Sequence, residues 1–164
     1  MNHQYGNIYF WKPEHEYGLF SNWYTSYISA YNIKFVNAEQ LFMWKKQQLF
    51  DPQNHELEQR ILNTNSPDQI KKLGRKVNNF DQELWDEKKY QIMVEVLMEK
   101  FSQNSDLKYK LIDTGDLMLV EASPYDKIWG IGLNEFDAKT KTWQGENLLG
   151  KALMEVRDIL IYDE

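Results

Sequence analysis

The sequence predicts a mainly α-helical α+β fold: a single-domain bundle of about six helices, with a few short β-strands near the N-terminus and around residues 117–121. A length of 164 residues fits one domain over 1–164, with a core that needs no disulfides. After residue 37 apolar residues recur at helical spacing, whereas runs rich in Tyr, Ile and Phe come earlier. Strands and helices do not alternate along the chain, so a parallel α/β sheet is not predicted.

The N-terminal third has the pattern of strands and loops. Residues 8–11 (Ile-Tyr-Phe-Trp) predict a short strand that ends at Pro13, and residues 27–36 predict an extended segment. Between them, residues 18–22 combine turn-forming and aromatic side chains, which indicates a turn.

Helix signals begin at Asn37. This residue predicts the N-cap of a helix over 38–50, with Gln40 reaching back as in a capping box. Ser66 and Pro67 start a later helix that Gly74 is expected to end as a C-terminal glycine. The other predicted helices cover 55–62, 81–103, 105–112 and 147–162.

Two segments between these helices have a different pattern. Residues 117–121 predict a strand. Residues 134–145 predict a loop that acts as a lid or a substrate selector.

Composition excludes several kinds of site. The chain has no cysteine, so it has no disulfide, thiol nucleophile or Cys-ligated metal. Its three histidines, at positions 3, 15 and 55, match no metal-binding spacing, so neither a metal nor a cofactor is predicted. The lone Gly130-Ile-Gly132 lacks the third glycine and the βαβ context of a dinucleotide site.

The charge balance restricts the partners. With 25 acidic and 19 basic residues, a net charge of −6 argues against a general nucleic-acid coat protein but allows a small basic site for one phosphorylated ligand. The first five residues lack the pattern of a secretory signal, and no apolar run approaches the roughly 18 residues of a membrane span. We therefore expect a cytoplasmic protein with no membrane partner.

Aromatic residues make up 15% of the chain. They serve either a Trp-rich core or flat platforms on which bases and sugars stack.

Glu39 and Lys46 hold unusual positions on the helix predicted over 38–50. On a wheel of about 100° per residue, both fall within the arc of its apolar side chains. They lie two turns apart, roughly 10.5 Å along the axis, so each can face a group held between them. Burial lowers the pKa of a lysine and raises that of a glutamate, as in catalytic groups, although a lysine can also extend to solvent.

A series of short motifs runs along nearly the whole chain. They are Phe10; Phe20-Ser21-Asn22; Glu39-x-x-Phe-Met-x-x-Lys46; Gly74-Arg75; Trp85; Lys100-Phe101; Leu119-Val-Glu-Ala-Ser-Pro124 with Asp126; Trp129-Gly-Ile-Gly132; and Asn147-Leu-Leu-Gly150-x-x-Leu-Met154-x-x-Arg157. In this order they resemble the YbiA/NADAR (NAD- and ADP-ribose-associated) family.

The resemblance implies a mostly helical, metal-independent N-glycosidase that cleaves the bond between ribose C1 and a nitrogen. It implies two substrate classes: phosphorylated ribosylaminopyrimidine intermediates of riboflavin biosynthesis, and ADP-ribose attached to guanine in nucleic acid. The alternative is a non-catalytic binding module for NAD, ADP-ribose or a modified base. Charged groups within an apolar helix face favour the enzyme, since binding alone needs no desolvated lysine.

Three residues are predicted to be catalytic. Glu39 would stabilise positive charge on C1 and the ring oxygen, or activate water. Lys46 would either attack C1 of the ring-opened sugar as a Schiff base or protonate the leaving nitrogen. Asp126, beside Trp129, becomes a site residue through the resemblance.

The other predicted site residues contact the substrate. Trp129 and Phe20 would stack on the base, with core packing the alternative for Phe20. Asn22 would bond to a ribose hydroxyl or a base edge, with an Asx turn as the alternative. Arg75 would clamp a phosphate or complement a helix C-terminus, and we favour the clamp. The set is completed by Ser21, Trp85, Glu121, Gly130 and Asn147. Asn147 could meet an anion at the start of the last helix, with a plain N-cap as the alternative that we favour.

Overall fold

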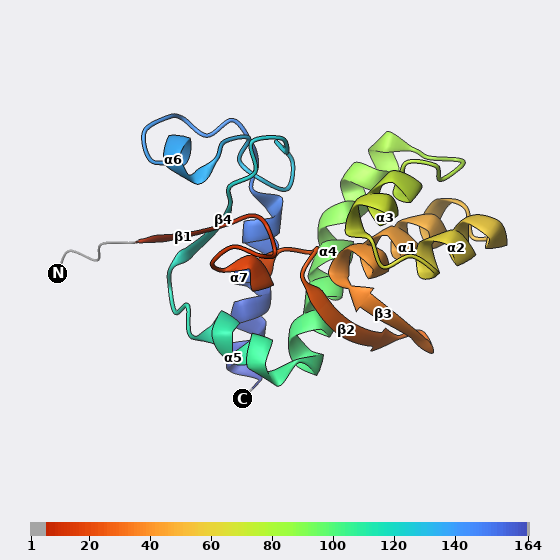
Figure 1. The fold of residues 1–164 in the computed structure, drawn as a ribbon, viewed down its shortest axis with the longest axis horizontal. Helices are drawn as coiled ribbons and strands as arrows, with labels where there is room; N and C mark the ends of the chain where they lie inside the picture. Colours follow the sequence, from red (N-terminus) through yellow and green to blue (C-terminus); the bar gives the residue numbers. More distant parts are fainter. Residues whose placement is uncertain (1–5, 164) are drawn as a thin grey trace. The chain divides into compact units, whose positions relative to one another are not determined.

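The computed structural model describes residues 6–163 (Figure 1). The chain divides into two compact units, one formed by residues 25–104 and the other by residues 1–24 with 105–164. The single domain over 1–164 stays a prediction. His3 and the segment used in the argument against a secretory signal lie outside the described residues.

The unit of residues 25–104 starts with a β-hairpin. Strands β2 (Thr25–Ala30) and β3 (Ile33–Asn37) pair in antiparallel fashion up to Ala30 opposite Ile33. The turn residues Tyr31 and Asn32 have φ angles of 55° and 59°, and two consecutive positive φ values match the twist of a two-residue hairpin. The extended segment predicted over 27–36 is therefore a hairpin.

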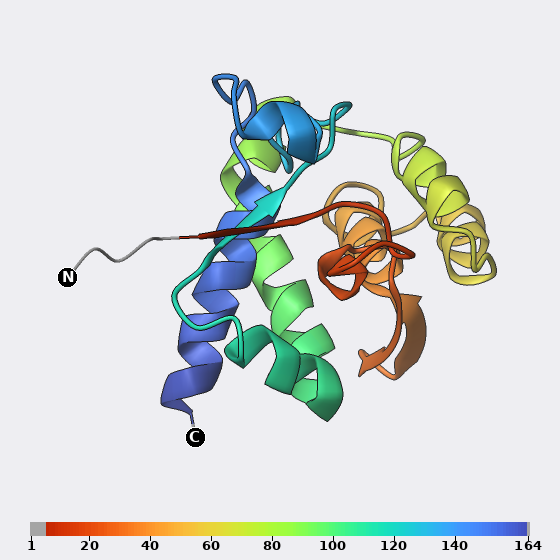
Figure 2. The ribbon, with the colours of Figure 1, turned by 60° about the vertical axis from the view of Figure 1, so that its left-hand side comes forward.

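Four helices complete this unit, and α1 lies at their centre. They are α1 (Ala38–Phe50), α2 (His55–Leu62), α3 (Pro67–Gly74) and α4 (Gln82–Gln103). Because α1 contacts the other three helices and the hairpin, nine of its thirteen residues are buried (Figure 2). Burial on nearly every side explains why a helical wheel of this segment shows no clean polar face.

The start of α1 follows the predicted cap with one change. The Asn37 side chain accepts a hydrogen bond from the backbone N of Gln40 at 2.8 Å. Gln40 Oε1 accepts from the backbone N of Val36 at 2.8 Å, one residue before the N-cap, and its Nε2 donates to Ile61 O at 3.0 Å. Gln40 thus ties α1 to β3 and α2 instead of closing a capping box.

Gly74 ends α3 as predicted, but for another reason. It is not among the glycines with positive φ in the described residues. A Cβ at this position would lie 2.0 Å from Met43 Sδ. The glycine therefore permits the close approach of α3 to α1, which also fixes the residue that follows it, Arg75.

The second unit is built on a parallel strand pair. β1 (Asn7–Phe10) pairs with β4 (Met118–Glu121), with Asn7 opposite Met118 and Phe10 opposite Glu121. Helix α7 (Leu148–Tyr162) contacts both β4 and α5 (Ser105–Ile112) (Figure 2). The 3-10 turn η1 (Gly18–Phe20) follows β1.

The segment 134–145, predicted as a loop, contains a short helix, α6 (Glu135–Ala138). The Asn134 side chain caps it by accepting from the backbone N of Asp137 at 2.8 Å. Ala138 joins a buried apolar cluster with Val120, Ile131 and Leu133. This part of the segment is therefore anchored to the unit's core.

No helix among the described residues has the length and apolarity that crossing a membrane requires.

Gly150 lets α7 lie close against β4. A Cβ at Gly150 would lie 2.1 Å from the backbone O of Leu119. Because strand backbone cannot move aside without breaking its ladder, Gly150→Ala should lower the free energy of unfolding by about 1–3 kcal/mol, the usual cost of overpacking. Urea denaturation measures this, with Lys151→Ala, an exposed neighbour on α7, as control. Equal denaturation midpoints for the two variants would contradict the prediction.

Lys100 lies fully buried in α4, and burial lowers the pKa of its amine to about 7. Between that value and the ordinary pKa near 10.5, the unfolded chain binds a proton that the folded chain does not. Stability should therefore rise with pH over this window and fall toward pH 7. Between pH 7.5 and 9.5 the wild type should gain about 2 kcal/mol relative to Lys100→Met. Urea denaturation of both proteins at the two pH values measures the difference, and parallel pH responses would contradict it.

Candidate active site

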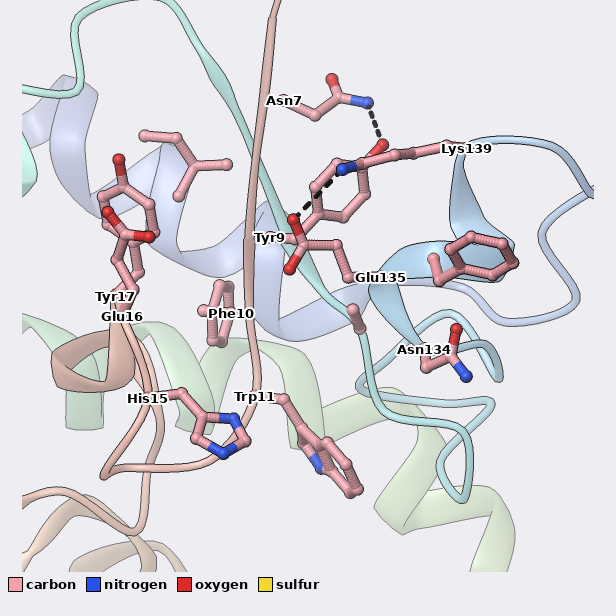
Figure 3. Close-up of a pocket in the computed structure, with 13 residues that line it drawn as sticks. Asn7, Tyr9, Phe10, Trp11, His15, Glu16, Tyr17, Asn134, Glu135 and Lys139 are labelled. Carbon is pink, nitrogen blue, oxygen red and sulfur yellow. Dashed lines mark hydrogen bonds and ion pairs between the residues drawn. The ribbon is translucent and has the colours of Figure 1, made fainter.

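Two parts of the structure are candidates for a functional site. One is the neighbourhood of the charged residues of α1, in the unit of residues 25–104. The other is a cavity of about 610 Å³ enclosed by the other unit (Figure 3). None of the predicted site residues lines that cavity.

Glu39 and Lys46 project from the first and third turns of α1. The Asn37 cap makes Glu39 the second residue of the helix, and its side chain is 8% exposed. Lys46 is half-buried. Both charged side chains are therefore at least partly withdrawn from solvent.

Aromatic rings surround the amine of Lys46. Its Nζ lies 4.9 Å from the ring centroid of Phe80 and 5.4 Å from that of Trp85. Trp85 in turn contacts Phe42 and Phe50, with centroids 5.4 Å and 6.1 Å apart, and Phe50 lies 5.2 Å from Phe80. We call Phe42, Phe50, Phe80 and Trp85 the aromatic box. Of these four, sequence reasoning singled out only Trp85 as a site residue.

Three effects act on the pKa of Lys46. Burial is the largest and lowers it from the ordinary value of 10.5. The negative charge of Glu39 raises it, and the positive charge of Arg75 lowers it again. The net effect is a lower pKa, which enlarges the neutral, nucleophilic fraction of the amine near neutral pH.

A hydrogen-bonded loop brings Phe80 over Lys46. The buried Asp51, just after α1, accepts from Asn54 Nδ2 at 2.8 Å and from the backbone N of Asn78 at 3.1 Å through its Oδ2. Asn79 has a φ of 58°, which turns the chain before Phe80. Asp51 thus fixes the loop that completes the aromatic box.

Arg75 follows the last residue of α3 and is exposed. It belongs to a basic run with Lys71, Lys72 and Lys76, of which Lys72 forms an ion pair with Asp68 at 2.8 Å. The effect of Arg75 on the pKa of Lys46 shows that the guanidinium and the amine are within electrostatic range. An exposed guanidinium beside a half-buried amine suits an anionic group of a ligand.

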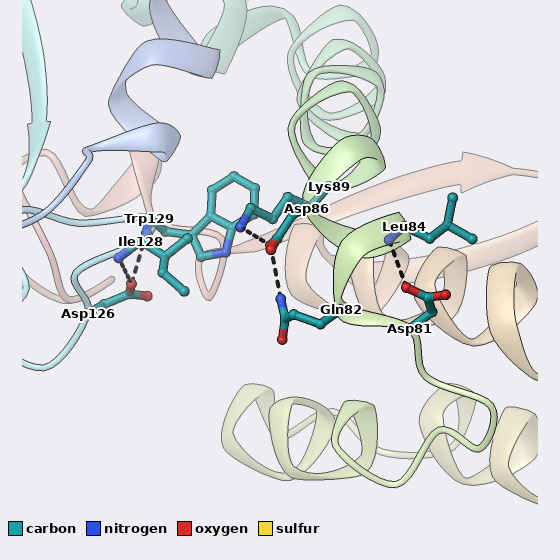
Figure 4. Close-up of polar contacts among 8 residues, drawn as sticks. All are labelled: Asp81, Gln82, Leu84, Asp86, Lys89, Asp126, Ile128 and Trp129. Atoms are coloured by element: carbon teal, nitrogen blue, oxygen red, sulfur yellow. Dashed lines mark hydrogen bonds and ion pairs between the residues drawn. The ribbon is translucent and has the colours of Figure 1, made fainter.

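In the other unit, Asp126 organises the turn that carries Trp129. Asp126 Oδ1 accepts from the backbone N of Ile128 at 2.9 Å and of Trp129 at 2.8 Å (Figure 4). These two bonds fix the direction in which the chain enters Trp129, whose side chain is half-buried. The predicted pair Asp126 and Trp129 therefore forms one local structure.

Asn147 and Gly130 connect this turn to β4. Asn147 Nδ2 donates to Leu119 O at 3.0 Å, and its Oδ1 accepts from the backbone N of Glu121 at 3.0 Å, so its amide covers the outer edge of β4. Its side chain caps no N–H of α7. A Cβ at Gly130 would lie 2.9 Å from Glu121 O, which only glycine avoids. Both residues position the segment around Glu121, and their contact with substrate stays a prediction.

The segment Phe20-Ser21-Asn22 is buried at the end of η1. Phe20 is 1% exposed and its ring centroid lies 5.8 Å from Phe10 and 6.4 Å from Tyr17. Ser21 Oγ accepts from the backbone N of Trp23 at 3.2 Å. Phe20 therefore belongs to the core of this unit, and its stacking on a base stays a prediction.

The predicted site residues thus fall into two sets. The unit of residues 25–104 brings together Glu39, Lys46, Arg75 and Trp85. The other unit holds Phe20, Ser21, Asn22, Glu121, Asp126, Trp129, Gly130 and Asn147.

A lysine with a lowered pKa beside two aromatic rings, within electrostatic range of a buried glutamate, suits acid–base or nucleophilic chemistry. Residues 9–161 match the NADAR domain family, and the chain belongs to that family. It is 41% identical to N-glycosidase R617 of Acanthamoeba polyphaga mimivirus, over 85% of this chain and 86% of the relative.

Two further comparisons agree with this family. The chain is 29% identical to Riboflavin biosynthesis protein VVA0006 of Vibrio vulnificus, over 93% of this chain and 38% of the relative. Its fold matches the NMR structure of the E. coli protein YbiA with a TM-score of 0.79 and 28% identity, over 98% of this chain and 88% of that one.

Proposed function

We propose that this N-glycosidase of the NADAR family hydrolyses the ribose C1–N bond of a phosphorylated ribosylaminopyrimidine, a nucleotide-like small molecule. The activity class rests on relatives named N-glycosidase, and the substrate class on a relative named as a riboflavin biosynthesis protein. The single observation that carries the proposal is the half-buried Lys46 amine, whose pKa is lowered by burial and which lies within electrostatic range of Glu39. A cytoplasmic location belongs to the same proposal.

Lys46 acts as the nucleophile in this proposal. When the sugar ring opens, C1 is joined to the aminopyrimidine nitrogen as an iminium. The neutral Nζ of Lys46 adds to C1, the C1–N bond to the aminopyrimidine breaks, and that nitrogen leaves with a proton. Water then hydrolyses the new iminium between C1 and Lys46, so one water is consumed for each bond cleaved.

Glu39 supplies the negative charge that this chemistry needs. Each intermediate carries positive charge at C1, which a nearby carboxylate stabilises strongly in surroundings that exclude water. The same carboxylate can take a proton from the attacking water when the enzyme–sugar iminium is hydrolysed. The aromatic box shields part of the Lys46 amine from water and offers flat surfaces to the planar base.

Arg75 binds the phosphate of the substrate in this proposal. An exposed guanidinium pairs with a phosphate through two parallel hydrogen bonds, a geometry that a lysine does not reproduce. Arg75→Gln should therefore raise KM by about tenfold, the cost of one lost charge-assisted contact. Arg75→Lys should recover only part of this loss in steady-state kinetics, and an unchanged KM in both variants would remove Arg75 from phosphate binding.

A pair of turnover assays tests the function. The purified protein is offered a ribosylaminopyrimidine phosphate and, separately, an oligonucleotide that carries ADP-ribosyl-guanine. We expect release of the aminopyrimidine from the first. Release from the oligonucleotide alone would move the substrate to the second class that the resemblance implies. Tight binding without release from either would establish a binding module.

A further inference from the structure

The cavity shown in Figure 3 lies wholly within the unit of residues 1–24 and 105–164 and is not used by the proposed reaction. Its volume of about 610 Å³ falls within the range of pockets that hold small molecules. Its walls are β1 with Trp11, the segment 15–17, Ala122, and α6 with Asn134 and Lys139.

The edge of β1, and not one of its faces, lines this cavity. Five consecutive residues, 7 to 11, contribute to the wall. Successive side chains of a strand point to opposite faces, so no single face presents five consecutive residues. A cavity that touches all five must therefore run along the strand's edge.

The hydrogen-bond register shows which backbone groups this edge presents. Phe10 O accepts from Ala122 N at 2.9 Å and Gly6 O accepts from Met118 N at 3.4 Å, both toward β4. Backbone groups alternate in direction along a strand, so Tyr9 directs its N–H and C=O away from β4. Within residues 6–163, β1 pairs with no strand besides β4. The Tyr9 backbone thus offers one donor and one acceptor, side by side, at the cavity.

Aromatic side chains flank this donor–acceptor pair. Tyr9, Trp11, Tyr17 and Phe136 all line the cavity. Phe136 is 81% exposed, so its ring is not occupied by the core of its unit, whereas the ring of Tyr17 stacks on the buried Phe20 and is 40% exposed. Rings of this kind, beside an exposed strand edge, are the elements that bind a planar heterocycle by stacking and by its hydrogen-bonding edge.

The charges around the cavity argue against an anionic ligand. The lining includes Glu16 and Glu135 against a single lysine, Lys139, which pairs with Glu135 at 3.4 Å. The whole unit has 14 acidic and 8 basic residues in the sequence, so it carries the entire net charge of −6. An uncharged ring suits this environment better than a phosphate does.

We propose that this cavity is a second binding site, which takes one amino-substituted nucleobase. The base's amino group would donate to Tyr9 O, its neighbouring ring nitrogen would accept from Tyr9 N, and its faces would stack on Phe136 and Trp11. An extended peptide is the weaker fit, because β1 is four residues long and presents few outward backbone groups.

Adenosine is the probe, since it carries the required edge and no phosphate. Its ribose C1 is joined to a ring nitrogen, which cannot form the ring-opened iminium of the proposed reaction. Titrated into ¹⁵N-labelled protein, it should shift the backbone amide of Tyr9 and its neighbours in β1. N6,N6-dimethyladenosine keeps the ring but loses the amino donor, and it should bind about tenfold more weakly. Adenosine monophosphate should bind no more tightly than adenosine.

Three variants locate the site. Phe136→Ala removes an exposed ring without disturbing the core and should weaken adenosine binding by about tenfold, the effect of losing one stacking partner. Tyr109→Ala removes a ring that is 71% exposed and does not line the cavity, so it should leave the affinity unchanged. Lys46→Ala should also leave it unchanged, which separates this site from the proposed reaction.

Three results would overturn the proposal. They are the absence of shifts in β1 at millimolar adenosine, equal affinity for the dimethylated nucleoside, and full binding by Phe136→Ala. If an unrelated extended peptide changes the amide chemical shifts of β1 and adenosine does not, the edge of β1 binds a peptide strand and not a nucleobase.

Discussion

Replacing Lys46 with methionine is expected to lower kcat by about 10³- to 10⁴-fold, the effect of removing a catalytic nucleophile or proton donor. Methionine is unbranched and of similar length, so it fills the space between Phe80 and Trp85 without a charge. The fold should persist because the amine is only half-buried. Steady-state kinetics and urea denaturation of the same preparation separate loss of chemistry from loss of structure.

Lys45 provides a matched control one residue earlier on α1. Burial lowers the pKa of Lys45, but the bonds from its Nζ to Glu95 and to the Tyr31 hydroxyl, with the charge of Glu95, together raise that pKa above the ordinary value. Lys45→Met should therefore leave kcat near the wild-type value. An equal loss of activity in the two variants would mean that α1 tolerates no loss of a lysine and would remove Lys46 from the chemistry.

Trapping separates the two roles that the sequence leaves open for Lys46. If its amine forms an iminium with the sugar, borohydride should reduce it during turnover and leave one sugar phosphate attached to the protein. Lys46→Arg should show no adduct, because a guanidinium stays protonated. A wild-type protein that turns over substrate and forms no adduct would favour protonation of the leaving nitrogen.

The elements that the sequence predicts well are those with local signals. Asn37, Ser66 and Asp81 each cap a helix that begins where predicted, because an N-cap is decided within four residues. The short helix α6 was missed although Asn134 caps it in the same way. One turn has no apolar periodicity to detect.

The surroundings of Lys46 needed the structure, because they depend on distant contacts. Phe80 reaches Lys46 through the bond from Asn78 N to Asp51, across 27 residues of sequence. No spacing rule connects Phe80 to α1. The close approach of Arg75 similarly depends on the absence of a side chain at Gly74, where the sequence indicated only a helix end. Local patterns thus predict the two charged residues, whereas their surroundings depend on tertiary packing.

Glu39→Gln is expected to lower kcat by about 10²- to 10³-fold, because it removes the charge that stabilises positive intermediates while keeping the shape of the side chain. The pH profile gives a second, independent readout. If neutral Lys46 is the nucleophile, kcat/KM rises with pH through the pKa of its amine. Removing the negative charge of Glu39 lowers that pKa, so the rising limb should move to lower pH.

Arg75→Gln should move the rising limb of the kcat/KM profile to higher pH, opposite to the effect of Glu39→Gln. The positive charge of Arg75 lowers the pKa of Lys46, so its removal raises the pKa and shifts the rising limb of kcat/KM to higher pH. A general loss of structure would lower kcat/KM of both variants at every pH without shifting their profiles along the pH axis. If Lys46 instead acts as the acid, kcat/KM falls as pH rises through the pKa of its amine. That falling limb should then move to lower pH in Glu39→Gln and to higher pH in Arg75→Gln. If the limbs of both variants coincide with that of the wild type, neither charge acts on the amine that controls the reaction.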